Sequence, residues 1–212
     1  MRSLTLTAAF LAATFAVSGC KIVKTTTADG SAPAADASGD DARIAGIVTD
    51  TYDAKLLPLI AEKALPVADL KAKLAAGLDS AGGQRGAGDG AAWNFAVAGE
   101  GKVVAANLTS RARTLDVDAD DDGTADLTLQ LGPVVKGTSL RDFAPALYDF
   151  TSFRDQIQFA QLGRALNDRA AAAIKLPEGD PVGHGVKFTG TFALRKATDA
   201  WLVTPTMVEV AP

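Results

Sequence analysis

The sequence has one cysteine, one histidine and no excess of positive charge among its 212 residues, and each of these absences excludes a class of site. One cysteine cannot close a disulfide within the chain, and one cysteine with one histidine cannot supply a Cys/His zinc site. The net charge of −4 comes without a basic stripe, which disfavours nucleic acid as a partner. Two Trp, two Tyr and nine Phe are few for an aromatic-lined carbohydrate cleft.

Catalytic motifs are scarce as well. No G-x-S-x-G nucleophile motif occurs, so the single histidine, His184, has no serine of that kind to activate. The glycine-rich residues 80–90 lack the Gly-Lys-Ser/Thr ending of a phosphate-binding loop. No pair of acidic residues stands out as a glycoside-hydrolysing pair. The sequence therefore predicts a protein that is not an enzyme.

The first twenty residues have the pattern of a bacterial lipoprotein leader. Arg2 supplies the positive start, and residues 4–17 form an apolar stretch that is too short to remain as a membrane-spanning helix. The stretch ends in Val17-Ser18-Gly19-Cys20, which resembles the lipobox, where small residues precede an obligatory cysteine. The resemblance implies that residues 1–19 are a signal peptide and that Cys20 is lipidated with acyl chains such as palmitate. Several acyl chains anchor a protein stably to the bacterial membrane.

Composition divides the rest of the chain. Residues 20–45 comprise the lipidated cysteine and a flexible tether, because residues 25–41 are small and polar and show no apolar periodicity. Residues 46–212 are long enough for a single globular domain with a core. The predicted location is the bacterial cell envelope, lipid-anchored and facing the periplasm, with the outer or the inner membrane left open.

Alternating apolar residues predict a β core over residues 92–136 and 186–210. Leu127, Leu129 and Leu131 share one face, as do Val186 and Phe188. The glycines of residues 99–102 predict a turn between two strands. Pro205 predicts an edge position or a bulge, since proline cannot donate a ladder hydrogen bond.

Apolar residues at three- and four-residue steps predict helical parts over residues 50–78 and 152–174. Pro58 and Pro66 are expected to break the first part. Ser152 and Asp155 have capping-box spacing and predict the start of the second. Strands, then a helix, then returning strands favour an α+β fold: an antiparallel OB-like β-barrel with added helices. A small β-sandwich with helices is the alternative.

One acidic stretch has the spacing of a metal-binding loop. Its pattern D-x-D-x-D-G-x-x-D matches the first nine positions of an EF-hand calcium loop and offers only hard oxygen ligands. The predicted calcium ligands are Asp118, Asp120, Asp122, Thr124 and Asp126. The pattern departs at its twelfth position, where Leu129 replaces glutamate, and strands rather than helices flank the loop. A solvated acidic hairpin is the alternative interpretation.

Several segments together resemble a family of predicted periplasmic lipoproteins that contain a domain of unknown function. The matching segments are GCKIV (19–23), KLLP (55–58), WNF (93–95), GEGKV (99–103), TLDVD (114–118), LGP (131–133), GRALN (163–167), FTG (188–190) and VTP (203–205). The resemblance implies an envelope lipoprotein with an OB-like barrel, whose relatives are often encoded beside sugar ABC transporters. It implies no catalytic residue.

The sequence and the resemblance lead to one functional hypothesis and two alternatives. The first is a non-enzymatic, lipid-anchored periplasmic protein that is accessory to sugar ABC transport and has transporter components as partners. The second is a structural envelope lipoprotein stabilised by calcium. The third is a glycan-processing enzyme with an unrecognised site.

Overall fold

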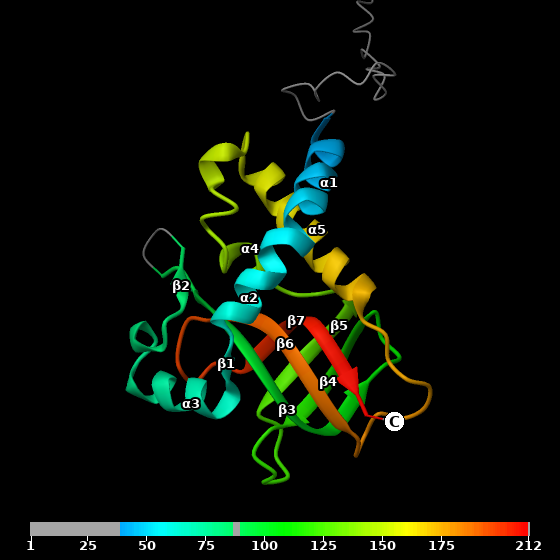
Figure 1. Ribbon diagram of the computed structural model, residues 1–212. Helices are drawn as coiled ribbons and strands as arrows, with labels where there is room; N and C mark the ends of the chain where they lie inside the picture. Colours follow the sequence, from blue (N-terminus) through cyan, green and yellow to red (C-terminus); the bar gives the residue numbers. More distant parts are fainter. Residues whose placement is uncertain (1–38, 87–89, 212) are drawn as a thin grey trace, which may run out of the picture. The chain divides into compact units, whose positions relative to one another are not determined.

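Five strands close into a barrel in the part of the chain that the computed structural model describes, residues 39–86 and 90–211 (Figure 1). These strands are β3 (Trp93–Asn107), β4 (Ala112–Asp118), β5 (Leu127–Pro133), β6 (Gly185–Leu194) and β7 (Trp201–Val210). They run in the order β3-β4-β5-β7-β6, and β6 pairs with β3 to complete the circle. The signal peptide, Cys20 and most of the predicted tether lie outside the described residues.

The topology confirms the predicted OB-like barrel, and the closure of its sheet excludes the sandwich alternative. One detail differs from the prediction, because β5 and β7 are parallel whereas the other barrel pairings are antiparallel. After β5 the chain passes through the helix of residues 156–173, and the next strand, β6, pairs with β3. β7 then turns back from β6 and therefore runs in the same direction as β5.

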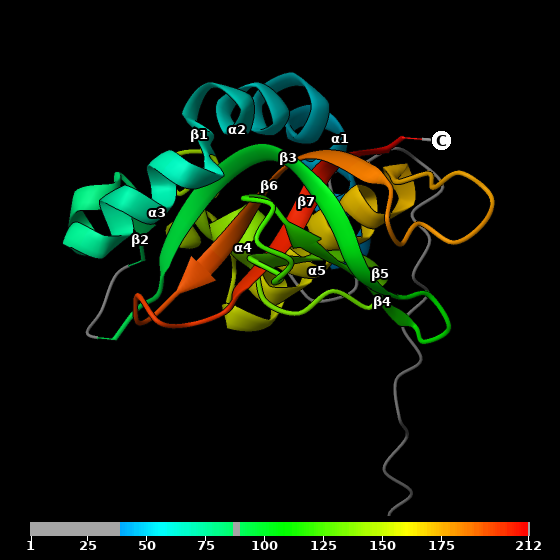
Figure 2. The ribbon, with the colours of Figure 1, turned by 90° about the horizontal axis from the view of Figure 1, so that it is seen from below.

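Strand β3 belongs to both halves of the barrel. Its residues 93–102 pair with β6, and its residues 102–107 pair with β4, so the strand curves across the molecule (Figure 2). The predicted turn at residues 99–102 is therefore wrong. The glycines serve close approach instead: a Cβ on Gly101 would lie 2.3 Å from the carbonyl oxygen of Asp118. Only glycine lets β4 reach this bend.

The barrel interior holds the apolar residues that the alternation predicts. Leu127, Leu129 and Leu131 are at most 3% exposed, and Val186 and Phe188 are equally buried. Trp201 packs in this core, where its ring stacks on Phe192 with 4.6 Å between centroids. The predicted irregularity at Pro205 is confirmed, because the β6–β7 register shifts between Thr189 and Gly190, opposite this proline.

A helical layer covers one side of the barrel (Figure 1). It contains α1 (Asp40–Thr51), a π-helical segment η2 (Tyr52–Leu56), α2 (Leu57–Lys63), the short α4 (Ser139–Asp142) and the long α5 (Gln156–Ala173). A second core lies between these helices, and its first stripe repeats every four residues: Ile44, Val48, Tyr52, Leu56 and Ile60. No helix of the described chain is long and apolar enough to cross a membrane.

The remaining elements lie against β3 (Figure 2). The two-residue strand β1 (Leu65–Pro66) pairs with β3 in parallel, and α3 (Val67–Ala76) follows it at once. Val67, Leu70 and Leu74 of α3 join the barrel core. A short 3-10 helix η3 (Asp79–Ala81) and strand β2 (Gln84–Arg85) complete this side.

Two features of the first helical part differ from the prediction. The first helix begins at Asp40, inside the range predicted as tether, because Ile44 and Val48 pack on α5 despite their polar surroundings in sequence. Pro58 does not break the helix, since the wider π-helical turn before it accommodates a residue without an N–H. The predicted break near Pro66 is confirmed: α2 ends at Lys63, and Pro66 precedes α3 as the N-cap residue.

The second helical part begins at Gln156 rather than at Ser152, which lies in a 3-10 helix η4 (Phe150–Ser152). Asp155 is the N-cap residue, and its carboxylate accepts the Gln158 N–H at 2.9 Å. The Gln158 side chain in turn accepts the Arg154 N–H at 2.9 Å. The helix is therefore capped three residues later than predicted, and the bond back from Gln158 reaches the N–H of Arg154 rather than that of the N-cap residue.

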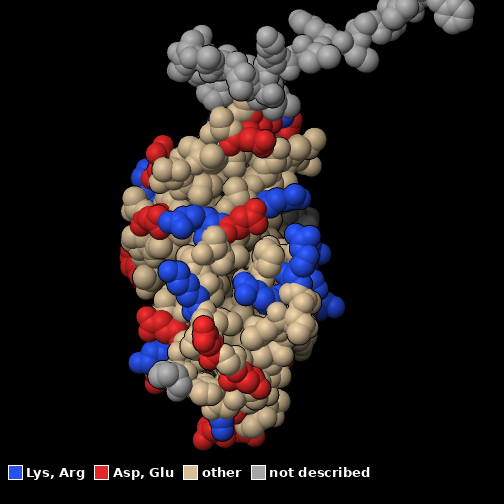
Figure 3. Space-filling model, turned by 90° about the vertical axis from the view of Figure 1, so that its right-hand side faces the viewer, with Lys and Arg blue, Asp and Glu red and all other residues tan. Residues whose placement is uncertain are grey.

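Charged side chains of both signs lie side by side on the face shown in Figure 3, separated by large uncharged areas. A group of basic side chains gathers toward its right-hand edge, and acidic side chains lie above and below this group. This face therefore presents a mixed charge pattern rather than a field of one sign.

The close approach at Gly101 generates a stability prediction. We expect Gly101→Ala to lower the free energy of unfolding by about 2–3 kcal/mol, because the added methyl group meets backbone atoms of β4 that cannot move aside. The matched control is Gly46→Ala on the exposed face of α1, where a Cβ meets nothing within 4 Å. The control should gain about 0.5–1 kcal/mol from helix propensity. Urea unfolding of both variants measures the difference, and an unchanged midpoint for Gly101→Ala would contradict it.

Candidate functional site

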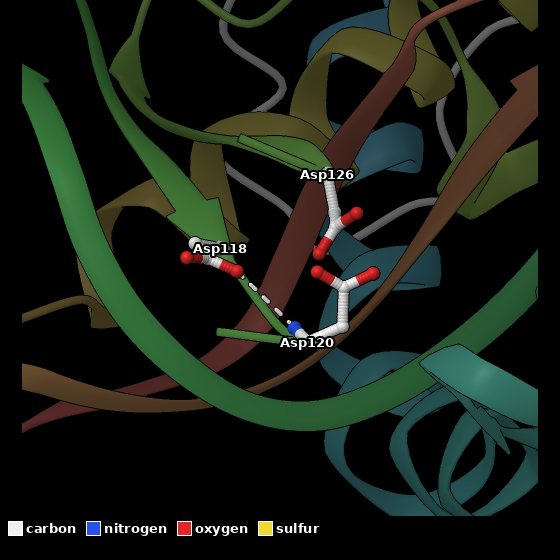
Figure 4. A group of neighbouring side chains, drawn as sticks. All are labelled: Asp118, Asp120 and Asp126. Carbon is white, nitrogen blue, oxygen red and sulfur yellow. Dashed lines mark hydrogen bonds between the residues drawn. The ribbon is translucent and has the colours of Figure 1, made fainter. Parts of the chain in front are cut away.

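The predicted metal loop joins β4 to β5 and folds around its own carboxylates. Figure 4 shows the side chains of Asp118, Asp120 and Asp126, which come from the two ends of the loop and its early part. The Asp126 N–H donates to the Val117 carbonyl at 2.8 Å and closes the base of the loop. Gly123 has φ +85, so the glycine is needed for the turn, as the motif predicts.

Asp118 is the centre of the loop. The residue is 2% exposed, and its carboxylate accepts backbone N–H groups from Asp121 at 2.8 Å, Gly123 at 2.7 Å and Asp120 at 3.2 Å. Burial acts to raise the pKa of Asp118, but these N–H groups, Gly123 first, hold the pKa below its ordinary value. The ionised carboxylate is thus the form that the loop stabilises.

Lys71 of α3 neutralises the two remaining members of the cluster. Its Nζ donates to Asp120 Oδ2 at 2.9 Å and forms a second ion pair with Asp126 Oδ1. The hydrogen bond to Asp126 is the main reason why the pKa of Lys71 lies above its ordinary value. Asp126 is nearly buried, and its other oxygen accepts the Ala119 N–H at 2.7 Å. Both ends of the loop are therefore fixed, one by backbone donors and one by an ammonium group.

The structure brings together three of the five predicted ligands. Carboxylate oxygens of Asp118, Asp120 and Asp126 lie within 4.8 Å of one another. Asp122 and Thr124 stand apart from this group in the exposed tip of the loop, where Asp122 accepts the Thr124 N–H at 2.7 Å. A cation placed among the three carboxylates would meet hard oxygen donors only, which suits calcium or an ammonium group.

Lys71 is the residue of this site that sequence reasoning misses. It lies 49 residues before Asp120, and nothing in its neighbourhood distinguishes it from other exposed lysines. The loop also borders a cavity of about 630 Å³ that Asp118 and Asp121 line together with Lys102, Lys187 and Glu209. His184 lies apart from the cluster: it is exposed, and its carbonyl accepts the Val103 N–H at 3.0 Å.

The backbone donors around Asp118 generate a pH prediction. A carboxyl group whose pKa is lower in the folded state stabilises the fold above about pH 4, and this contribution is lost as pH falls through the folded pKa. We therefore expect Asp118→Asn to be less stable than the unaltered protein at pH 7, with a gap that narrows steadily below pH 4. Thermal unfolding between pH 7 and pH 2.5 measures the gap, and a constant gap would contradict the role given to these donors.

Comparison with solved structures supports the fold. A crystal structure described as an OB-fold protein from Thermotoga maritima matches with a TM-score of 0.58 and 15% sequence identity. The match covers 81% of this chain and 98% of that protein. At this identity the likeness concerns the fold alone, which is the barrel that the topology describes. Among curated proteins, none matches the chain.

Comparison with family models covers nearly the whole sequence. The model described as "Predicted periplasmic lipoprotein (DUF2291)" matches residues 10–209, which include Cys20, the barrel and the helical layer. The match agrees with the resemblance found in the sequence and with a lipid-anchored location in the bacterial envelope. The chain belongs to the DUF2291 family of predicted periplasmic lipoproteins.

Proposed function

We propose that this lipoprotein is a non-catalytic accessory module that docks on a protein component of a sugar ABC transporter through the groove between α1 and α5. The groove has a volume of about 540 Å³. Its apolar lining includes the buried Ile44 and the exposed Ala45 and Ile157. Asp41, Arg164 and Asp168 supply charges. Ile157 carries the proposal, because 69% of this large apolar residue is exposed to water. An apolar patch with a polar rim is typical of a protein-binding surface.

The groove lies at the end of the domain where the anchoring segment joins. The carboxylate of Asp40, the first residue of α1, accepts hydrogen bonds from Arg154 at 2.8 Å and from Gln158 at 2.6 Å. These two residues flank Ile157 in sequence, so the start of α1 and the groove are held together. Cys20 precedes Asp40 by 20 positions, and a chain of that length reaches at most about 70 Å. A membrane-bound partner therefore lies within reach of this face.

The choice of a sugar transporter as partner rests on the family resemblance, because relatives are often encoded beside sugar ABC transporters. The groove between α1 and α5 supports the proposed docking surface, and the family resemblance supports the proposed partner. An OB-like barrel does not itself determine a function, since one fold hosts many.

A site-specific crosslinking experiment tests the docking surface. We expect a photoreactive residue at position 157 of the full-length lipidated protein, in its native membrane, to capture transporter subunits or a sugar-binding protein. Position 207 is the control, because Met207 is a 38% exposed apolar residue of β7, outside the groove. Ile157→Asp should reduce capture from position 161 at least tenfold, since a buried charge opposes apolar contact. Recovery of the same abundant envelope proteins from positions 157 and 207 would refute the proposal.

The second candidate function is a calcium-stabilised structural lipoprotein, and the convergence of three carboxylates favours it. In this proposal calcium takes the place of the Lys71 ammonium group beside Asp120 and Asp126. Extracellular calcium modules bind with dissociation constants of about 0.1–1 mM. At that affinity, 10 mM calcium would stabilise the fold by about 1.4–2.7 kcal/mol.

The calcium proposal has its own melting experiment. We expect calcium to raise the melting temperature relative to EDTA, and to raise it more in Lys71→Met, where no ammonium group competes for the carboxylates. Asp120→Ala should abolish the response, because it removes one converging ligand. Lys187→Met is the control, since Lys187 forms only a surface pair with Glu100 at 3.6 Å. The same melting temperature with calcium and with EDTA, in both the unaltered protein and Lys71→Met, would refute the calcium proposal.

A further inference from the structure

A second cavity lies beside α5, and it is lined by segments from three parts of the chain. Its volume is about 510 Å³, within the range of small-molecule sites. Arg111 comes from the loop between β3 and β4, Val134 and Thr138 from the segment after β5, and Arg164, Asn167 and Asp168 from α5. This cavity is distinct from the acidic loop.

Specific hydrogen bonds hold the segment after β5 in place. The Gln130 side chain forms two hydrogen bonds with the backbone of Lys136: it accepts the N–H at 2.8 Å and donates to the carbonyl at 3.2 Å. The Val134 N–H donates to the Arg111 carbonyl at 2.9 Å, which ties the segment to the β3–β4 loop. A Cβ on Gly163 would lie 2.8 Å from Thr138, so this glycine permits close approach to α5. The walls of the cavity are therefore built by the fold.

Two arginines of the lining have no side-chain partner in the part of the chain that the structure describes. Among the described residues, neither Arg111 nor Arg164 forms a side-chain hydrogen bond or an ion pair, whereas Arg113 donates to the Gly132 carbonyl at 2.8 Å and Arg169 to Asp53 at 2.8 Å. Asp168 is the one acidic side chain of the lining, so the cavity carries a net positive charge. Guanidinium groups in such a position suit a carboxylate or a phosphate.

Asn167 adds a separate indication of a ligand. The residue is 5% exposed, and its Nδ2 donates to the Gly137 carbonyl at 2.9 Å. Its Oδ1 is buried without a hydrogen-bond partner in the described chain. A buried amide oxygen without a donor is costly, and native structures keep few of them. Asn167 also lines the cavity, so a hydroxyl group of a ligand there would supply the missing donor once the amide turns toward it.

We infer that this cavity binds a small hydroxylated organic anion. Its carboxylate or phosphate lies between Arg111 and Arg164, and its hydroxyl groups donate to Asn167 Oδ1 and to the Asp168 carboxylate. The cavity shares Ala160, Arg164 and Asp168 with the groove between α1 and α5, whereas Arg111 and Asn167 line the cavity and not the groove. Binding of such an anion is a property that the proposed docking function does not require.

Calorimetric titration of the full-length protein in detergent micelles tests the inference with matched six-carbon probes. D-gluconate carries both features, D-sorbitol only the hydroxyl groups and hexanoate only the carboxylate. We expect gluconate to bind at least tenfold more tightly than sorbitol and hexanoate. Sorbitol 6-phosphate distinguishes the two anionic groups, and tighter binding of either it or gluconate identifies the group that the arginines hold. Failure of both to bind saturably would overturn the inference.

Three arginine variants locate the binding. Arg111→Ala and Arg164→Ala should each weaken the binding of the preferred anion about tenfold, the usual effect of losing a charge-assisted hydrogen bond. Arg195→Ala is the control, because Arg195 is equally exposed and lies in the loop between β6 and β7. An equal loss in Arg195→Ala, or none in Arg111→Ala, would overturn the assignment.

The same variants separate this inference from the docking proposal. Ile157→Asp should leave anion binding unchanged, since Ile157 lines only the groove. In washed membranes without added anion, Arg111→Ala should leave crosslinking at position 157 unchanged, since Arg111 lines only the cavity. Anion binding that vanished in Ile157→Asp would overturn the separate site.

Discussion

The architecture depends on one long strand, β3, whose two stretches pair with different neighbours. β3 pairs with β6 along its first ten residues and with β4 along its last six, and the barrel closes only because the chain bends between them. The bend also positions the acidic loop. β1 pairs with β3 at Val97, and Asp118 pairs at Lys102, five residues further along. Helix α3, which follows β1, therefore brings Lys71 to the loop that follows Asp118.

The contact between the barrel and the helical layer is partly polar. Gln130, Ser139, Thr191 and Thr204 are all at most 5% exposed and bond to one another, with Gln130 Nε2 donating to Thr204 at 3.3 Å and Thr191 to Ser139 at 2.9 Å. Directional bonds fix the relative position of the two layers more strictly than apolar contact does. The Gln130 side chain also bonds to the backbone of Lys136 and so ties the segment after β5 to this polar group.

Local patterns predict what depends on local contacts. Alternation locates Leu127, Leu129 and Leu131 because a strand with one buried face must alternate. The glycines at 99–102 mislead, because glycine permits both turns and close contacts, and only the distant Asp118 decides between them. The role of Lys71 cannot be predicted from local sequence for the same reason, since its partners lie 49 and 55 residues away. The acidic loop is recognisable from spacing, but the cation that neutralises it is set by the tertiary fold.

The groove and the cavity lie on either side of one stretch of α5, and Ala160, Arg164 and Asp168 line both. An anion held by Arg164 in the cavity would change the charge that the groove presents to a protein partner. Binding free energies that share a residue are reciprocal: whatever the ligand does to the affinity of the partner, the partner does to the affinity of the ligand. If both proposed sites are occupied in the cell, this geometry makes the docking of the lipoprotein sensitive to a small molecule in the periplasm. The coupling needs no conformational change, because the shared side chains alone carry it.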